Sequence, residues 1–430
     1  MKVRPAGGKL GVMCVGLGAV TTTAITGVLM SRKGLSKPIG SFACEGIMRV
    51  GKGRDKCYKE VKDLVPVASL DDMVFGAWDL YEDDAYDAAV KAAVLKPQDV
   101  EPVKDELKAI KPYKALFDKN YASNIDGPNV KVGATRWELT GQLREDIRHF
   151  KAANDCDRVV VIWIASTEKY IKRNDDVHGS VAAFEAAMKA NDVANVAPSM
   201  CYAYAAMREG CPFVMGAPNL CLDIPAMWEL AEETGMPIAG KDFKSGQTMM
   251  KTVLAPAFFT RQLGVTGWFS TNILGNRDGM VLDNPENFET KRVSKTSALE
   301  NILDSDVYPE LYSDMYHKVR INYYPPRGDE KESWDNIDIF GWMGYPMTIK
   351  VNFLCRDSIL AAPLVLDLIL FSDLALRAGE KGIQEFLSFY SKAPMHKDGD
   401  RPVHDLFKQF AMLKNKIREF AGYEADQELD

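Results

Sequence analysis

Short, almost continuous runs of apolar residues mark the first two-thirds of the chain. Three of them, residues 10–17 (LGVMCVGL), 73–79 (MVFGAWD) and 158–166 (RVVVIWIAS), have the composition of parallel strands that are covered on both faces. Shorter runs at 213–216 (FVMG) and 236–240 (MPIAG) are also typical of buried strands. We therefore predict a parallel sheet built largely from the N-terminal part of the chain.

Helical patterns lie between these strands. Residues 20–31 follow the first strand directly, and the alanine-rich segment 83–94 follows the second. Strands that alternate with helices form parallel sheets with helices on both faces. The predicted fold class is therefore α/β with a doubly wound parallel sheet, in which residues 50–70 form a charged insertion.

The pattern changes near residue 248. Between 248 and 356, strand-like segments (GVTGWFSTNILGN, VRINYYP and MTIKVNFLC) are separated by long polar loops, which predicts an inserted α+β domain. Residues 357–376 form a helix that is apolar on most faces and must be deeply buried, and the polar tail after residue 400 ends in a frayed helix. We predict a discontinuous nucleotide-binding domain, 1–247 plus 357–430, interrupted by a catalytic domain at 248–356.

Composition and charge exclude several classes of protein. The 430 residues are 47% hydrophobic and 26% charged, an ordinary globular balance, and the net charge of -7 argues against a nucleic-acid binder. The basic residues Lys2, Arg4 and Lys9 precede an apolar run as in a signal peptide, but that run contains GLG and no small-residue cleavage site follows. No later apolar stretch reaches the roughly 18 residues of a membrane span, so we expect no transmembrane helix, and cysteines without disulfide spacing favour a cytoplasmic protein.

The cysteines and histidines show no metal-binding spacing. None of the eight cysteines forms a CxxC pair, and most lie in apolar runs, which predicts reduced core residues. The five histidines form no HxxxH or HxH pair, so we expect no structural zinc site.

The first motif with chemical content is Gly16-Leu17-Gly18 at the end of the first predicted strand. Glycines there allow a tight turn and let a pyrophosphate approach the N-terminus of the next helix, which makes the predicted sheet Rossmann-like. Ala19 and Thr21 follow as further candidate contacts, Thr21 at the usual third glycine position and with a hydroxyl to donate. An ordinary turn is the alternative, and the position between strand and helix favours the nucleotide interpretation.

A dinucleotide site of this kind also needs an acid on the second strand to bind the ribose hydroxyls. Spacing alone indicates Glu45, whereas Asp79 fits the geometry better if residues 40–70 are an insertion. Either acid favours NAD over NADP, because it repels a 2′-phosphate. The alternative for Asp79 is a helix N-cap.

The segment 240–248 (GKDFKSGQT) is the strongest motif. A strand ends and a helix begins there, so the exposed N–H groups of Ser245, Gly246 and Gln247, together with Lys244, can bind a dianion. The alternative is an ordinary helix cap with solvated lysines. Later segments carry further candidates: 272–279 (NILGNRDG), the lysine pair of TKRVSKTS, which alone would be a solvated face, then 328–331 (GDEK), 354–358 (LCRDS) and Lys392.

These segments, in this order, resemble the inositol-1-phosphate synthase family from about residue 10 to 395, most closely in DFKSGQT with KTVLAP, in NILGNRDG and in DSILAAPLVLDL. The resemblance and the motifs together give the predicted NAD contacts, Gly16, Gly18, Ala19, Thr21, Asp79, Ser166, Thr167 and Asp278. For the substrate phosphate it implies Ser245, Gly246, Gln247, Lys295 and Lys331. The catalytic residues that it implies are Lys291, Lys295, Lys331, Lys392, Asp242, Asn276 and Asp357.

The resemblance implies an activity as well. It is the NAD-dependent isomerisation of D-glucose 6-phosphate to 1D-myo-inositol 3-phosphate by oxidation at C5, enolisation, aldol closure and reduction, which serves inositol and phospholipid biosynthesis. Oxyanions develop at C5 and C1, so fixed cations are required, and Lys291 and Lys392 are the candidates. The family also implies a homotetramer built by the 248–356 domain.

Alternatives remain open. A sugar-phosphate dehydrogenase with net NADH release, or a non-catalytic NAD-binding regulator, would use the same cofactor site. This chain also departs from the family, with AVTTT where a glycine- and asparagine-rich stretch is common, and with changes at Lys241, Ile273 and Arg356. No ligand motif shows whether a metal or ammonium ion assists.

Overall fold

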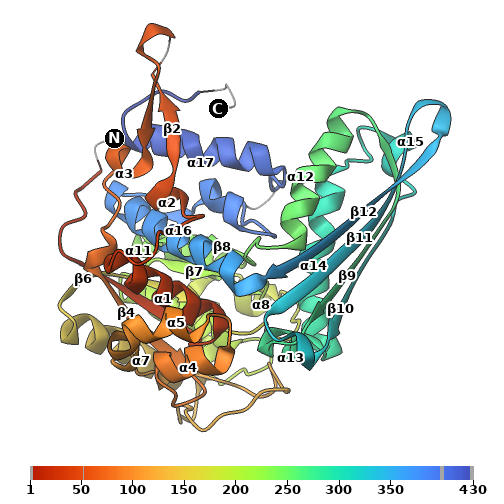
Figure 1. Ribbon diagram of the computed structural model, residues 1–430. Helices are drawn as coiled ribbons and strands as arrows, with labels where there is room; N and C mark the ends of the chain where they lie inside the picture. The colour runs from red at the N-terminus through yellow and green to blue at the C-terminus, as the bar shows by residue number, and fades with distance from the viewer. Residues whose placement is uncertain (1–2, 52, 398–400, 427–430) are drawn as a thin grey trace.

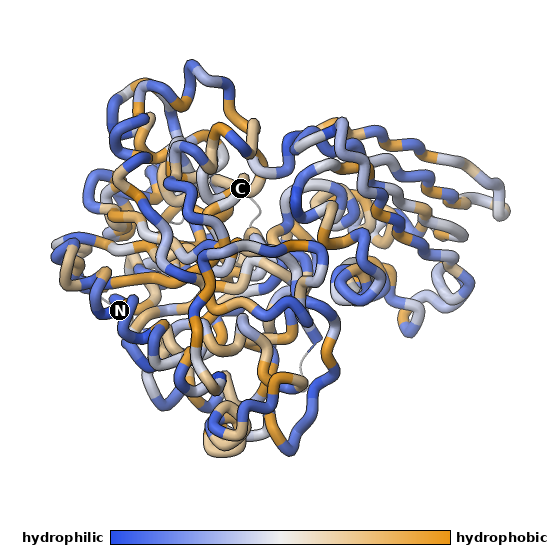
Figure 2. The backbone as a smooth tube through the Cα atoms, turned by 90° about the horizontal axis from the view of Figure 1, so that it is seen from below, coloured by the Kyte–Doolittle hydropathy of each residue, from blue (hydrophilic) through white to orange (hydrophobic). Residues whose placement is uncertain are grey.

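The computed structural model describes residues 3–51, 53–397 and 401–426, and for residues 292–297 it describes the backbone but not the side chains. Two β-sheets with their helices lie beside one another, the larger on the left of Figure 1 and the smaller on the right. Apolar segments run through the interior of the larger body (Figure 2), where its helices pack on the sheet.

The larger sheet has seven strands, and every neighbouring pair is parallel. In spatial order the strands are β13 (Gly382–Ile383), β8 (Pro237–Gly240), β7 (Phe213–Met215), β6 (Cys156–Trp163), β1 (Lys9–Val15), β4 (Met73–Asp79) and β5 (Tyr113–Lys114). The α/β fold class predicted from the apolar runs is therefore confirmed.

Helices cover both faces of this sheet because successive strand residues point in opposite directions. Val12 and Cys14 of β1 pack on one face, and Met13 and Val15 pack on the other. The first face is covered mainly by α1 (Ala19–Arg32), α4 (Ala85–Ala92), α16 (Asp357–Ala378) and α17 (Leu406–Phe420). The second is covered by α7 (Arg136–Ala153), α9 (Val181–Lys189), α10 (Pro198–Arg208) and α11 (Pro225–Thr234).

The strand order places a topological switch point between β1 and β6. From β1 the chain moves outward to β4 and β5, and it then returns to the other side of β1 with β6. Ligands of open α/β sheets bind in the crevice at the C-terminal ends of the strands at such a point. Gly16 and Ser166 follow these two strands, so both lie at this crevice.

The smaller sheet has four strands, all from the segment predicted as an insertion. Their spatial order is β10 (Tyr316–Tyr323), β9 (Gly264–Leu274), β11 (Glu330–Phe340) and β12 (Pro346–Arg356), with β9 and β10 parallel and the other pairs antiparallel. One face packs against α12 (Gln247–Thr260) and α14 (Pro285–Ile302). All four strands lie between residues 264 and 356, and the domain division at about 247 and 357 stays a prediction.

The remaining helices are short. They are α2 (Phe42–Glu45), α3 (Val61–Leu64), α5 (Pro97–Val100), α6 (Lys104–Lys108), α8 (Asp175–His178), α13 (Arg277–Leu282) and α15 (Pro309–Tyr312). The charged segment 50–70 contains part of a hairpin, β2 (Ile47–Val50) with β3 (Cys57–Glu60), which projects from the larger body in Figure 1.

Two sequence expectations were wrong. The polar tail does not end in a frayed helix, because Leu413, Ile417 and Phe420 of α17 are buried in the core of the larger body. The cysteines are all free, as expected, but Cys57 is exposed and Cys44 is only partly buried, because both lie around the β2–β3 hairpin rather than in the sheet.

Helix α16 is the one helix among the described residues that is long and apolar enough to cross a membrane. However, 67% of its most apolar window is buried inside the protein, against α1 and the larger sheet. It therefore has the surroundings of a core helix, as its apolar composition predicted.

Candidate active site

A cavity of about 470 Å³ lies where the C-terminal edge of the larger sheet meets the inserted domain. Its walls come from the residues that follow β1, β4, β6, β7 and β8, from α13 and α14, and from the first turn of α16. Predicted site residues among its lining are Gly16, Gly18, Ala19, Asp79, Ser166, Thr167, Asp242, Ser245, Asn276, Asp278, Lys291, Asp357 and Lys392.

The loop after β1 fits a dinucleotide. Gly16 has a φ of 99°, and a Cβ there would lie 2.9 Å from the Cα of Ala165, so the turn requires glycine. A Cβ at Gly18 would meet no atom within 4 Å and would project into open space on the cavity wall. Gly18 is also the N-cap of α1 and no side chain caps that helix, which leaves its first N–H groups for an anion.

Asp79 joins the ends of β1 and β4. Its Oδ2 accepts a hydrogen bond from Leu17 N at 2.6 Å, and its Oδ1 accepts one from Tyr81 N at 3.0 Å. Burial raises the pKa of the Asp79 carboxyl, although these N–H groups oppose the rise. The N-cap alternative for Asp79 is wrong, because Asp84 caps α4, and Glu45 does not line the cavity.

The threonines after the loop do not reach the cavity. Thr21 is 1% exposed, and its hydroxyl donates to Gly16 O at 2.7 Å. Thr22 and Thr23 likewise donate to the carbonyls of Gly18 and Ala19, at 3.0 and 2.7 Å. The structure therefore does not place Thr21 with the other predicted cofactor contacts, because helical Ser and Thr hydroxyls bond back to their own helix.

A buried carboxylate joins two lysines at the opposite end of the cavity. Asp242 follows β8, Lys291 lies on α14 and Lys392 follows the short 3₁₀ helix Glu385–Tyr390. Asp242 Oδ1 accepts hydrogen bonds from Lys291 Nζ at 2.9 Å and from Lys392 Nζ at 3.1 Å. Three segments that are distant in sequence thus hold two ammonium groups on one oxygen.

Charges in this cluster compete with burial. Burial alone would raise the pKa of Asp242, but Lys291 and Lys392 outweigh it and hold that pKa below its ordinary value. Burial would lower the pKa of Lys291, but Asp242 and Asp278 raise it above the ordinary lysine value. For Lys392, burial and the charges of Lys291 and Lys331 outweigh Asp242, so its pKa is lowered. Lys291 is therefore suited to remain a cation, and Lys392 to transfer protons.

The position of Lys291 depends on contacts between α14 and the larger body. Asn287 Nδ2 donates to Thr167 O at 2.8 Å, and Thr290 Oγ1 donates to Glu168 O at 3.0 Å. Both side chains are buried; Asn287 lies one helical turn before Lys291, and Thr290 directly precedes it. They dock α14 onto the loop that carries the predicted cofactor contact Thr167.

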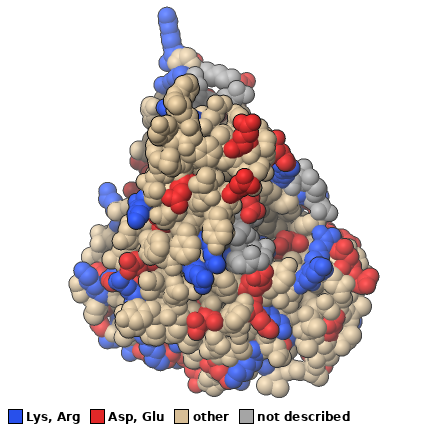
Figure 3. All heavy atoms as spheres, turned by 90° about the vertical axis from the view of Figure 1, so that its right-hand side faces the viewer, with Lys and Arg blue, Asp and Glu red and all other residues tan. Residues whose placement is uncertain are grey.

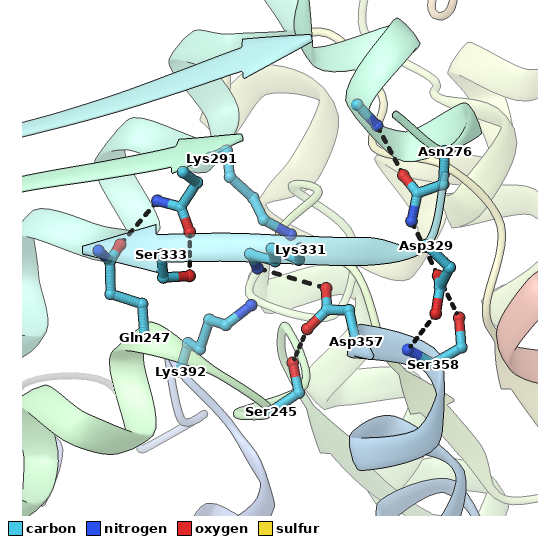
Figure 4. A network of polar contacts seen from close by, with 12 residues as sticks. Ser245, Gln247, Asn276, Lys291, Asp329, Lys331, Ser333, Asp357, Ser358 and Lys392 are labelled. Carbon is cyan, nitrogen blue, oxygen red and sulfur yellow. Dashed lines mark hydrogen bonds and ion pairs between the residues drawn. The ribbon is translucent and has the colours of Figure 1, made fainter. Parts of the chain in front are cut away.

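A second carboxylate, Asp357, lies beside the N-terminus of α12. Ser245 Oγ donates to Asp357 Oδ1 at 2.7 Å, and Lys331 Nζ lies 3.3 Å from Asp357 Oδ2. A Cβ on Gly246, the uncapped N-cap of α12, would lie 3.9 Å from Lys331 Nζ. Figure 4 shows Lys331 extending toward the same space as the other two active-site lysines. This corner offers N–H groups and a cation to an anion.

Gln247 has its side chain engaged elsewhere. Its Nε2 donates to Asp335 Oδ2 at 3.1 Å, and its Oε1 accepts from Asn272 Nδ2 at 2.7 Å. Asn272 Oδ1 in turn accepts from Ser333 Oγ at 3.1 Å (Figure 4). Gln247 can therefore serve an anion through its backbone N–H, while its side chain ties α12 to the smaller sheet.

Asn276 connects the two domains at the cavity wall. Its Nδ2 donates to Asp329 Oδ1 at 3.1 Å, and Asp329 accepts from Ser358 N and Oγ at 3.2 and 2.8 Å. Its Oδ1 accepts from Gly279 N at 3.0 Å and caps α13. Burial raises the pKa of Asp329.

The predicted anion-site residue Lys244 does not join this arrangement. Lys244 is buried and donates to Gln409 Oε1 of α17, away from the cavity. It lies one residue before the chain turns into the site, so its side chain points to the opposite side. Lys295 lies in α14, and its side chain is outside the described residues.

Sequence reasoning missed four residues that shape the site. Asn287 and Thr290 were hidden in a polar segment whose only structural signal is the Asn-Pro-Glu start typical of a helix N-terminus. Tyr81 and Arg277 line the cavity and stack on one another, and Arg277 lies within the quoted motif NILGNRDG. Within the described part of the chain, no group of three His, Cys, Asp or Glu side chains could hold a metal ion.

Comparison with known proteins gives consistent results. The model of the myo-inositol-1-phosphate synthase family matches residues 10–418. The chain is 62% identical to inositol-3-phosphate synthase 1 of Bacteroides thetaiotaomicron, over 98% of this chain and 97% of that protein. It is 34% identical to inositol-3-phosphate synthase 1 of Populus euphratica, over 96% of this chain and 86% of that protein. The crystal structure of inositol-3-phosphate synthase from Caenorhabditis elegans matches with a TM-score of 0.91 at 27% identity, over 99% of this chain and 88% of that one.

Proposed function

Because the chain belongs to the myo-inositol-1-phosphate synthase family, we propose that it converts D-glucose 6-phosphate to 1D-myo-inositol 3-phosphate. The chain is an isomerase that uses NAD. The observation that carries the proposal is the pair of buried lysines on Asp242, at one end of a cavity whose other end fits a dinucleotide.

Substrate binding in this proposal begins with the phosphate. The backbone N–H groups at the start of α12, the hydroxyl of Ser245 and the ammonium of Lys331 would hold it. Gly246 leaves the approach to these groups without a side chain. Fixing the phosphate of a flexible open-chain sugar also fixes its reacting carbons, which is a large part of the barrier reduction in such reactions.

The cofactor would lie with its adenosine ribose at Asp79 and its pyrophosphate at the Gly16–Gly18 loop. Ser166 and Thr167 would border it on the β6 side, and Asp278 on the side of the inserted domain. Bound NAD⁺ would supply the oxidation at C5 of the sugar and the reduction that completes the reaction.

Between the oxidation and the reduction, the two lysines on Asp242 would stabilise negative charge on the sugar oxygens and transfer protons. Lys291, whose pKa Asp242 and Asp278 raise, would stabilise a developing oxyanion as a fixed cation. Lys392, whose pKa burial lowers, would move a proton to or from the sugar oxygen. A simple dehydrogenase develops one oxyanion, whereas closing a carbocycle develops two, at C5 and C1. Two convergent cations therefore suit the cyclisation better.

The test is to identify the product. After incubation with glucose 6-phosphate and NAD⁺, we expect carbon and phosphorus NMR to show a cyclic inositol phosphate, with no build-up of reduced cofactor. Lys291→Ala and Lys392→Ala should each lower turnover by about 10²–10³ or more. Reduced cofactor that accumulates in proportion to the sugar consumed would instead indicate a dehydrogenase.

We also propose that the inserted domain builds a homotetramer through the outer face of its sheet. Exposed Trp334 and Leu354 lie on that face, and Trp342, Met343 and Tyr345 are exposed at the β11–β12 turn. The side of the molecule where this sheet lies presents mainly uncharged atoms at its centre (Figure 3). An uncharged surface of this kind is typical of an interface. A monomer in sedimentation at micromolar concentration would contradict the proposal.

A further inference from the structure

The cavity that fits a dinucleotide has an unfavourable charge balance for one. Among the described side chains that line it, six are carboxylates and four are cationic, Lys91, Arg277, Lys291 and Lys392; the carboxylates are Asp79, Asp83, Asp242, Asp278, Asp329 and Asp357. The pyrophosphate of NAD adds two more negative charges. A cation at the nucleotide end is therefore needed, because like charges at short range repel strongly.

Three of the four cations already have a carboxylate partner. Lys91 Nζ lies 2.5 Å from Asp83 Oδ1, and Lys291 and Lys392 share Asp242. Arg277 forms no ion pair with any carboxylate in the described ranges 3–51, 53–397 and 401–426. Among the described side chains of the cavity lining, it is thus the cation whose charge is available to a ligand.

The guanidinium of Arg277 lies at the nucleotide end, although Arg277 belongs to the inserted domain. Its central carbon is 4.1 Å from the centre of the Tyr81 ring. Tyr81 comes two residues after Asp79, whose carboxylate is bonded to Leu17 of the glycine loop. The charge of Arg277 is close enough to act on the pKa of Asp79. A guanidinium stacked on a ring keeps its N–H edges free to bind a planar or tetrahedral anion.

The glycine loop itself supplies no side-chain donor. Residues 17, 19 and 20 are leucine, alanine and valine, and the hydroxyls of the three threonines that follow are bonded to backbone carbonyls. Only backbone N–H groups of α1 face an anion there. A cation that reaches this place from another segment would complete the site.

We propose that Arg277 binds the pyrophosphate of NAD and thereby closes the inserted domain over the cofactor, with Tyr81 as the platform that holds its side chain. This inference deepens the proposed function, on which it rests for the orientation of the cofactor. In this proposal, the segment that carries Asn276 and Asp278 also contacts the pyrophosphate of NAD, which takes no part in the chemistry.

The test measures binding of NAD, ADP-ribose and adenosine to the full chain by isothermal titration or by competition, without sugar substrate. Arg277→Ala should weaken NAD and ADP-ribose by about 10- to 100-fold, typical of losing a charge-assisted bond, and adenosine by less than about threefold. Arg277→Lys should recover part of the loss, and Tyr81→Leu should lose about two- to fivefold. Affinity for NAD in Arg277→Ala should also fall less steeply with added salt than in the wild type.

The control is Arg261→Ala, because Arg261 is an exposed arginine of the inserted domain that does not line the cavity. Unchanged affinity in Arg277→Ala, or an equal loss for adenosine and ADP-ribose, would overturn the assignment. Thermal melting of each variant identifies any loss of fold. If Arg277→Ala is unfolded, the affinities of Arg277→Lys are compared with those of the wild type instead. Product identification with the wild type tests the proposed function separately, since these binding ratios do not depend on turnover.

Discussion

Removing the charge of Asp242 is the sharpest test of how the active site holds its lysines. In Asp242→Asn the shape is kept, but the negative charge 2.9 Å from Lys291 Nζ and 3.1 Å from Lys392 Nζ is lost. At an effective dielectric constant of about 20, each attraction is worth about 5 kcal/mol before solvent and neighbouring charges reduce it. The pKa of both lysines must then fall, because burial opposes their charged forms.

The expected result is a loss of turnover with a characteristic pH dependence. We expect kcat to fall by about 10²–10³ near neutral pH, the usual effect of losing an oxyanion-stabilising group. Since lower pH restores the ammonium form of Lys291, the alkaline limb of the kcat profile should move to lower pH in Asp242→Asn. Initial rates of inositol phosphate formation between about pH 6 and pH 9 would show this movement.

A matched control lies next to this residue in the chain. Lys241 Nζ lies 2.6 Å from Asp223 Oδ2, and neither side chain lines the cavity. Asp223→Asn therefore removes a comparable charge pair outside the site and should leave kcat within about twofold, since partly exposed pairs contribute little. Wild-type turnover in Asp242→Asn, or a lower kcat with an unmoved alkaline limb, would refute the reasoning.

Three other substitutions test separate parts of the structure. Asp79→Ala should weaken NAD binding by about 1–3 kcal/mol in titration calorimetry, whereas Glu45→Ala should not; the opposite order would move the ribose site to Glu45. Asn287→Ala should lower kcat by about tenfold or more with little change in phosphate affinity, because α14 loses its anchor on Thr167 O; an unchanged kcat would exclude this positioning role. Burial lowers the pKa of Lys244 from 10.5 to about 7. Between these two pH values the folded state therefore binds fewer protons than the unfolded chain. The contribution of Lys244 to the free energy of unfolding therefore rises with pH across this range. Lys244→Met should therefore increase the free energy of unfolding more at about pH 6 than at about pH 10 in urea denaturation, and an equal effect at both would show that Lys244 is not desolvated.

The larger sheet could be predicted because its strands are buried on both faces. The run 73–79 matches β4 residue for residue, and 10–17 and 158–166 overlap β1 and β6 to within a few residues at each end. In such strands burial alone sets the composition, so apolar runs identify them. The tight turn at Gly16 was equally visible, since its conformation requires glycine.

Two elements of the inserted domain could not be predicted in the same way, because their buried faces are partly polar. Residues of β11 alternate in burial, but Lys331, Ser333 and Asp335 are among those that point inward, so the apolar alternation of a strand is absent. Helix α14 likewise buries Asn287 and Lys291 in its first half, and among its described side chains the buried apolar ones, such as Leu299, lie near its C-terminal end. On these buried faces, polar residues of the candidate site stand where a sequence pattern would require apolar ones. Functional sites are where sequence reasoning is expected to fail.

Site residues could likewise be predicted where a local motif marks them, but not where the site depends on contacts between distant segments. Residues near glycine turns or helix starts, such as Ser245 and Asp357, could be identified from local motifs. The pairing of Asp242 with Lys392 spans 150 residues, and only the folded chain brings these groups together. The direction of Lys244 could not be predicted either, because adjacent residues of an irregular turn point to opposite sides.

The contacts between the two domains explain how one cofactor molecule could serve the whole reaction. A cyclisation without net oxidation needs the same NAD at its first and last steps, whereas a dehydrogenase must release its reduced cofactor in every turnover. The inserted domain borders the proposed cofactor site twice, through Asn287 on the carbonyl of Thr167 and through Arg277 on the ring of Tyr81. The helix that would bring Lys291 to the sugar is thus the same helix that docks beside the proposed cofactor site. Weakening either contact should therefore do more than slow the reaction: it should release reduced cofactor before ring closure is complete, and the fraction of turnovers that leak would measure how far the domain interface keeps the chemistry redox-neutral.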